Sequence, residues 1–160
     1  MKKLIIAAFM FVTSFGTNVM ADGHSIKMGI ILGFTGPIES LTPAMAASAE
    51  LAFKEASDSG SLLGGKKIKP IRADSTCVDS AAATAAAEGV IAQGVAAIMG
   101  ADCSGVTGAI ASNVAVPNGV VMISPSATSP GLTTLDDKDC LCWFRFYFIS
   151  CITANYWWVK

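Results

Sequence analysis

The sequence has 160 residues, of which 52% are hydrophobic and 14% charged, and its formal net charge at pH 7 is −1. This composition lacks the clustered basic residues with which proteins bind nucleic-acid phosphates, so we expect no nucleic-acid partner. The one histidine, His24, stands near the N-terminus, where we expect a solvent-exposed residue rather than a catalytic group or a metal ligand.

Residues 1–21 have the three zones of a secretory signal peptide. Lys2 and Lys3 form a positive start, residues 4–15 are mostly apolar, and Val19 and Ala21 supply the small residues before a cleavage site. The apolar run is well short of the roughly 20 residues that span a bilayer, which disfavours a membrane anchor. We therefore expect cleavage after Ala21 and a periplasmic protein.

The first half of the remaining chain predicts a strand, a helix and a second strand. The apolar run 26–32 is typical of a buried strand, and after the loop GFTGPIES a helix is expected with Thr42 as N-cap and Pro43 as first residue, ending at Gly60. Pro70 places the next strand, residues 66–74, at a sheet edge or a bulge. The expected inward face of the helix is Met45, Ala49, Ala52, Phe53 and Ala56.

The second half repeats this alternation. A helix capped by Asp79 or Ser80 is expected to run to about Gln93, followed by a strand at 95–100, a third helix, the breaker PNG and a fourth strand at 120–124. This order predicts an α/β fold, a Rossmann-like parallel sheet with helices on both faces. The expected inward residues are Ala83, Ala87, Val90 and Ile91 in the second helix, and Val106, Ile110 and Val114 in the third.

Ligands of such sheets bind beyond the carboxyl ends of the strands, where the loops GFTGPIES, DSTCVD, ADCSG and SPSATSP follow. The third loop does not support catalysis. Ser104 lacks the first glycine of GxSxG, since Asp102 stands there, and neither Ser104 nor Cys103 has a later histidine as base. We expect no catalytic residue and no enzyme activity.

Cys77 and Cys103 alone do not make a zinc site, and GFTG is not a phosphate-binding loop, so we expect no metal and no cofactor. Both cysteines follow strands of one parallel sheet and belong to an exported chain, where disulfides persist. If the two strands are near neighbours, the thiols lie on the same rim. A disulfide closing this loop should stabilise the fold by about 3 to 4 kcal/mol.

Ser104 begins a helix, and its residues allow two interpretations. A ligand carboxylate could accept hydrogen bonds from the hydroxyls of Ser104 and Thr128 while the Ser126 carbonyl faces an ammonium group. Alternatively, these hydroxyls cap the helix and shape a proline turn. Spacing alone leaves both open.

The motifs FTGPIES, DSTC, GADCSG, ISPSATSP and LTTLDD occur in this order. Over residues 26–139 the chain resembles the N-terminal part of periplasmic substrate-binding proteins of branched-chain amino-acid ABC transporters. The resemblance implies the first lobe of a type I periplasmic binding fold, incomplete here. It further implies that Cys77 and Cys103 match the family's disulfide.

In that family two lobes close on a ligand, and the first lobe holds its α-carboxylate and α-ammonium groups. Carried over by motif, Ser104, Ser126, Ala127 and Thr128 are the binding residues. Members selective for leucine-like ligands often have an aromatic residue after TGP, where this chain has Glu39, Ser40 and Leu41, and we add Leu41 to the set. The implied partners are an amino-acid-like ligand and a membrane permease; the alternative is a sensing module of the same fold.

The aromatic tail at 141–160 differs from the lobe assigned to 22–140. The family's hinge and second lobe do not follow, so we expect no tight binding by this chain alone. A frameshifted or shortened reading frame is the favoured explanation. The alternatives are a native variant of the family and a membrane helix over 141–159, the latter at a cost of about 2.5 to 3.5 kcal/mol for Arg145.

Overall fold

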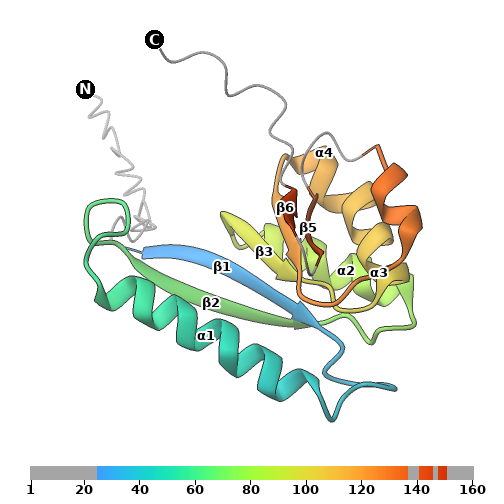
Figure 1. Cartoon of the computed structure of the whole chain (residues 1–160), viewed down its shortest axis with the longest axis horizontal. Coiled ribbons are helices and arrows are strands. Elements are labelled where there is room, and N and C mark those ends of the chain that lie inside the picture. Colours follow the sequence, from blue (N-terminus) through green and yellow to red (C-terminus); the bar gives the residue numbers. More distant parts are fainter. Residues whose placement is uncertain (1–24, 137–140, 146–147, 151–160) are drawn as a thin grey trace, which may run out of the picture.

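The computed structural model describes residues 25–136, 141–145 and 148–150. The expected signal peptide and its cleavage site lie outside these residues. The described chain forms one six-stranded sheet flanked by helices (Figure 1). Among the described helices, none has the length and apolar character needed to cross a membrane.

The sheet has the strand order β2-β1-β3-β4-β5-β6, and its first five strands are parallel. Strand β6 runs antiparallel to β5, so the described residues of the aromatic tail, 141–145 and 148–150, continue the sheet. The strands are β1 (Ser25–Leu32), β2 (Lys67–Asp74), β3 (Ala97–Gly100), β4 (Val121–Ser124), β5 (Leu141–Arg145) and β6 (Phe148–Ser150).

Helices cover both faces of the sheet, as the alternating sequence predicts. Helix α1 lies along one face, while the helices that follow β2 and β3 lie on the other (Figure 1). Side chains of β1 alternate between the two layers: Ile30 and Leu32 pack with α1, and Ile31 packs with the opposite helices. The helices are α1 (Thr42–Asp58), α2 (Ser80–Ile91), α3 (Ser104–Ile110), the π-helix η1 (Ala111–Ala115), α4 (Val116–Asn118) and the 3₁₀ helix η2 (Pro130–Thr134).

Of the two positions that Pro70 allows, a sheet edge or a bulge, the structure shows the edge, since β2 is the first strand of the sheet. Its solvent side also carries Lys67 and Lys69, which are exposed. Charged residues and proline on an edge oppose pairing with another chain, because proline offers no amide donor and lysines resist burial. This edge is therefore protected against aggregation.

Two expectations for α1 are wrong. Thr42 is not the N-cap: Leu41 occupies that position without a side-chain hydrogen bond, and Thr42 is fully buried, donating from Oγ1 to the Gly33 carbonyl at 3.1 Å. The demand of the buried Gly33 carbonyl for a donor outweighs the capping preference of threonine. Ala52 is exposed, whereas Ala46, six residues earlier in the helix, is fully buried.

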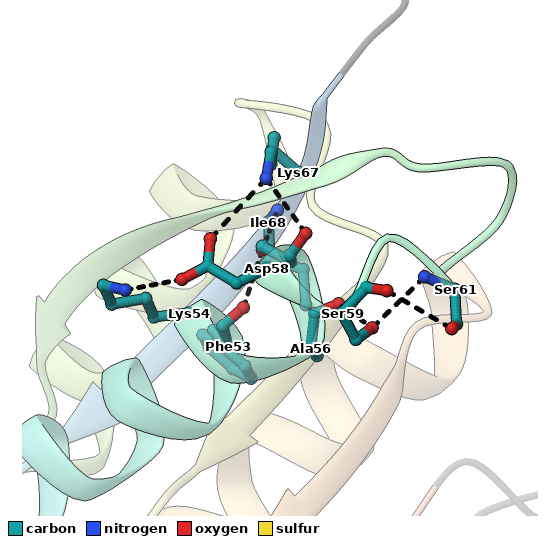
Figure 2. A network of polar contacts seen from close by, with 9 residues as sticks. Phe53, Lys54, Ala56, Asp58, Ser59, Ser61, Lys67 and Ile68 are labelled. Carbon is teal, nitrogen blue, oxygen red and sulfur yellow. Dashed lines mark hydrogen bonds and ion pairs between the residues drawn. The ribbon is translucent and has the colours of Figure 1, made fainter.

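A polar network fixes the end of α1 to the start of β2 (Figure 2). Asp58 pairs with Lys54 one turn earlier and with Lys67 of β2, at 2.5 and 3.6 Å. Ser57 donates to the Phe53 carbonyl and accepts from the Ile68 amide at 2.8 Å. The ion pairs are exposed and contribute little, so the buried Ser57 is the main link.

Helix α2 packs closely on the sheet through small residues. Asp79 caps it, accepting hydrogen bonds from the amides of Ala81 and Ala82, and the expected inward residues Ala83, Ala87 and Val90 are buried. Below them, a Cβ on Gly29 of β1 would lie 2.8 Å from Val90 Cγ1. Glycine at this point of β1 therefore lets the helix approach.

The third predicted helix runs from Ser104 to Asn118 as α3, η1 and α4, with the expected Val106, Ile110 and Val114 buried. Gly119 ends it with a φ of +63°, which favours glycine. The strands on either side start later than expected, at Ala97 and Val121. Beyond β4 the sheet continues with β5, the strand that contains Phe144 and Arg145 and pairs with β4 in parallel.

Candidate functional site

The carboxyl ends of β1 to β4 lie at one edge of the sheet because the four strands are parallel. The four loops that leave them are residues 33–41, 75–79, 101–103 and 125–129. These loops hold all but one of the expected ligand-contact residues, since Ser104 is the first residue of α3. The expected site therefore occupies the position at which open α/β sheets bind ligands.

Ser104 joins the third and fourth of these loops. Its Oγ accepts hydrogen bonds from the backbone amides of Thr128 at 3.0 Å and Ser129 at 3.1 Å. The structure thus brings Ser104 and Thr128 together, as the carboxylate interpretation requires. The amides of Thr128 and Ser129 are used within the protein, whereas no described residue accepts the Ser104 hydroxyl proton or bonds the Thr128 hydroxyl.

Ser126 and Ala127 lie in the same loop but face different ways. The Ser126 hydroxyl donates to the carbonyl of Asp102 at 2.9 Å, so its side chain points back toward the third loop. Ala127 is buried, and its amide donates to the Ser124 Oγ at 2.9 Å. Among the described residues none donates to the Ser126 carbonyl.

The structure does not join Leu41 to this group. Its backbone hydrogen bonds lie within its own loop and the first turn of α1, to Ile38 and Met45, and its side chain is 61% exposed. Because α1 and α3 cover opposite faces of the sheet, Leu41 starts from the other side of the strand ends. Within the described chain it has no contact that supports a place beside Ser104.

The predicted disulfide between Cys77 and Cys103 is present, with an Sγ–Sγ distance of 2.03 Å and a Cα–Cα distance of 5.2 Å. Strands β2 and β3 are not adjacent, since β1 lies between them, and the bridge crosses the end of β1. A Cβ at Gly33 would lie 3.1 Å from Cys77 Cβ. Glycine after β1 therefore leaves room for the bridge.

Asp102 is a residue of this site that sequence reasoning missed. Its side chain is buried, with Oδ2 accepting from the Gly33 amide at 2.8 Å and Oδ1 from the Cys103 amide at 3.0 Å. Ser75 Oγ also reaches Oδ1, at 3.4 Å. An acidic residue two positions after a strand and immediately before a cysteine was the available signal, but its partners lie in distant segments.

Asp74 joins the first two loops. It accepts hydrogen bonds from the Thr35 hydroxyl at 2.5 Å and from the Thr76 amide at 2.8 Å. Burial by itself raises the pKa of Asp74, but these hydrogen bonds outweigh it and leave the pKa below its ordinary value. The carboxylate form is therefore the one that the folded loops stabilise.

This shift predicts a dependence of stability on pH. Because the folded-state pKa of Asp74 is lowered, its contribution is present above the unfolded pKa of about 3.9 and is lost as pH falls through the folded value. In Asp74→Asn, acid unfolding between pH 5 and 2 should show a shallower slope than in the wild type. The exposed Asp136→Asn is the charge control, and an equal slope in all three proteins would contradict the prediction.

The described residues do not bring three His, Cys, Asp or Glu side chains together as possible metal ligands. What the site offers instead is hydroxyl donors and a backbone carbonyl. This arrangement suits a small zwitterion, with donors for an anion on one side and an acceptor for a cation on the other.

The sequence matches the profile of a family described as "Periplasmic binding protein" over residues 25–157. A Leu/Ile/Val-binding protein of Rhizobium johnstonii is 30% identical over 131 residues, which cover 82% of this chain and 34% of that protein. The Leu/Ile/Val-binding protein of Escherichia coli is 31% identical over 114 residues, or 71% of this chain and 30% of that protein. The chain thus spans about a third of the length of these relatives.

Solved structures give the same result. LivJ of Streptococcus pneumoniae, a branched-chain amino acid transporter substrate-binding protein solved with isoleucine, superposes with a TM-score of 0.65 at 32% identity. A substrate-binding protein of an ABC transporter from Desulfitobacterium hafniense, solved with leucine, gives 0.62 at 28%. Each match covers 74% of this chain and 33% of the other. The fold is that of a type I periplasmic binding protein, of which an incomplete lobe is present.

Proposed function

Since the chain belongs to the periplasmic binding protein family, we propose that it provides the first lobe of a solute receptor for a branched-chain amino acid. The observation that carries the proposal is the contact between Ser104 and the loop containing Thr128. It brings together two hydroxyl-bearing residues that follow different strands, Ser104 after β3 and Thr128 after β4. The receptor would act outside the cytoplasm, after removal of residues 1–21, with residues 22–140 as the binding lobe.

The ligand's charged groups fit the groups available there. Its carboxylate would accept hydrogen bonds from the hydroxyls of Ser104 and Thr128, whose protons no described residue accepts. Its ammonium group would donate to the Ser126 carbonyl. Hydrogen bonds to ionised groups contribute about 1.5 to 3 kcal/mol each, roughly twice a neutral one.

Binding by this lobe alone is expected to be weak. Receptors of this kind close two lobes around the ligand, and the ligand stabilises the closed form by contacting both. The chain spans about a third of the length of its relatives, so the contacts of the ligand's side chain would come largely from elsewhere. We propose that the whole receptor delivers the amino acid to the membrane permease of an ABC transporter.

The proposal is tested with a pair of ligands that differ only in the carboxylate. Saturation-transfer NMR of the chain should show saturable binding of L-leucine and none of 3-methylbutylamine, which is leucine without its carboxylate. Ser104→Ala should weaken leucine binding about tenfold, because a hydrogen bond to an ionised group is lost.

Ser112→Ala is the matched control, since Ser112 is an exposed serine in the same helical segment. It should bind leucine like the wild type, and Ser104→Thr should retain most of the binding because it keeps the hydroxyl. Equal signals from leucine and the amine, or leucine binding unchanged in Ser104→Ala, would contradict the proposed site.

A further inference from the structure

One buried residue, Asp102, contacts all four loops at the carboxyl edge of the sheet. Its side chain is 3% exposed and accepts hydrogen bonds from the Gly33 amide after β1 and the Ser75 hydroxyl after β2. Its backbone carbonyl accepts from the Ser126 hydroxyl after β4. Asp102 itself follows β3, so it is a common partner of the loops that surround the proposed site.

The Asp102–Ser126 contact lies beside the contact of the proposed site. Ser104 is two residues after Asp102, and Thr128 is two residues after Ser126. The two loops are therefore joined at two successive points, by Ser126 Oγ to the Asp102 carbonyl at 2.9 Å and by the Thr128 amide to Ser104 Oγ at 3.0 Å. Any shift of Asp102 relative to β1 and β2 would move both.

The carboxylate cannot be replaced there by its amide. Its Oδ2 and Oδ1 face the N–H groups of Gly33 and Cys103. Asparagine has one acceptor oxygen and an NH₂ group that only donates, so one of these amides would face another donor. A buried donor left without an acceptor carries the full cost of its desolvation.

The disulfide is a separate and more limited link. It joins the β2 loop to the β3 loop covalently. Cys77 also packs against Gly33, but the disulfide forms no bond to the β1 loop or the β4 loop. Asp102 joins β3 to both of these as well. The two links therefore overlap only between β2 and β3.

We propose that Asp102 is the positioning residue that holds Ser104 against the Thr128 loop, and that it does so whether or not the Cys77–Cys103 disulfide is formed. The inference rests on the proposed function only in taking Ser104 as a ligand contact. The placement of the loops by Asp102 requires no ligand, so the two can fail separately.

Hydrogen exchange followed by NMR on the full chain tests this without ligand. In Asp102→Asn, the protection of the Gly33, Thr128 and Ser129 amides should fall about tenfold or more relative to the amides of β1. If Asp102 contributed only to overall stability, its replacement would lower the protection of these amides and of the β1 amides together. The exposed Asp136→Asn is the matched control and should leave the ratio unchanged.

Reduction supplies the second comparison. In the wild type treated with dithiothreitol, the protection of Thr128 and Ser129 relative to β1 should persist, whereas in reduced Asp102→Asn it should be lost. If Asp102→Asn does not fold, Ser126→Ala is used instead, because it removes only the hydrogen bond between Asp102 and the loop after β4. It should lower the protection of the Thr128 and Ser129 amides and leave that of the Gly33 amide unchanged. The inference would be overturned if these protection ratios were unchanged in the variants. It would also be overturned if reduction of the disulfide alone abolished the protection of Thr128 and Ser129 in the wild type.

Discussion

Removal of the Cys77–Cys103 disulfide is expected to lower the free energy of unfolding by about 3 to 4 kcal/mol. The bridge joins residues 26 positions apart, and its chief effect is to restrict the unfolded chain, which loses the entropy of an open loop of that length. In the folded state the bridge crosses the end of β1, where Gly33 accommodates Cys77. Urea unfolding at equilibrium, with and without the disulfide, measures the difference.

The chain has three further cysteines that could form other disulfides and must be replaced for this measurement: Cys140, Cys142 and Cys151. The proteins compared with and without the disulfide should all carry serine at these three positions, so that only Cys77 and Cys103 can form a disulfide. The double variant Cys77→Ser/Cys103→Ser should then match the reduced protein within error. A loss below about 1 kcal/mol, or free thiols at Cys77 and Cys103 in the exported protein, would contradict the account.

Gly100→Ala is expected to destabilise the fold by about 3 kcal/mol or more. Gly100 pairs with Ile31 between β3 and β1 and has a φ of +134°, a conformation that residues with a Cβ rarely adopt. A Cβ here would lie 2.0 Å from the Ile31 carbonyl oxygen. Since the obstacle is the backbone of the interior strand β1, relief requires separating β1 from β3 just before the Asp102 loop.

Gly89→Ala is the matched control for this change. Gly89 lies inside α2, and a Cβ there would meet no atom within 4 Å. Alanine should therefore stabilise the helix by about 0.5 to 1 kcal/mol, the opposite sign. Thermal unfolding of the three proteins would contradict the account if Gly100→Ala melted within a few degrees of the wild type.

Local pattern was sufficient to predict the order and type of the elements. Apolar runs at 26–32 and 95–100 are short and bounded by glycine, and the inward faces of α2 and of the third helix follow the 3.6-residue period. Pro70 restricted β2 to an edge or a bulge, and β2 lies at an edge. These features depend on neighbours in sequence, which the sequence displays directly.

Features that depend on distant partners could not be predicted in the same way. Thr42 was expected to cap α1 because threonine commonly does so, but the buried carbonyl of Gly33 requires its hydroxyl. Asp102 resembles an ordinary loop acid until the Gly33 amide and Ser126 hydroxyl are known to face it. The partners lie 69 and 24 residues away, and no local pattern encodes them.

The expected site was predicted in part. The disulfide joins the loops after β2 and β3, and the Thr128 loop after β4 approaches Ser104. Both features follow because these parallel strands end at the same edge of the sheet. The use of Ser104 Oγ as an acceptor for two amides could not be predicted, because a hydroxyl can accept or donate. The ligand-binding roles of Ser104, Ser126, Ala127, Thr128 and Leu41 remain predictions.

We propose that the edge formed by Ser104 and the Thr128 loop binds the charged groups of an amino acid. The most direct test is titration of the ¹⁵N-labelled chain with L-leucine while backbone amide shifts are followed. We expect saturable shifts at Gly105, Thr128 and Ser129 with one common Kd of about 1 mM or weaker, as few contacts allow. Absence of shifts at these amides, or larger saturable shifts at amides of α1 or β2, would contradict the claim.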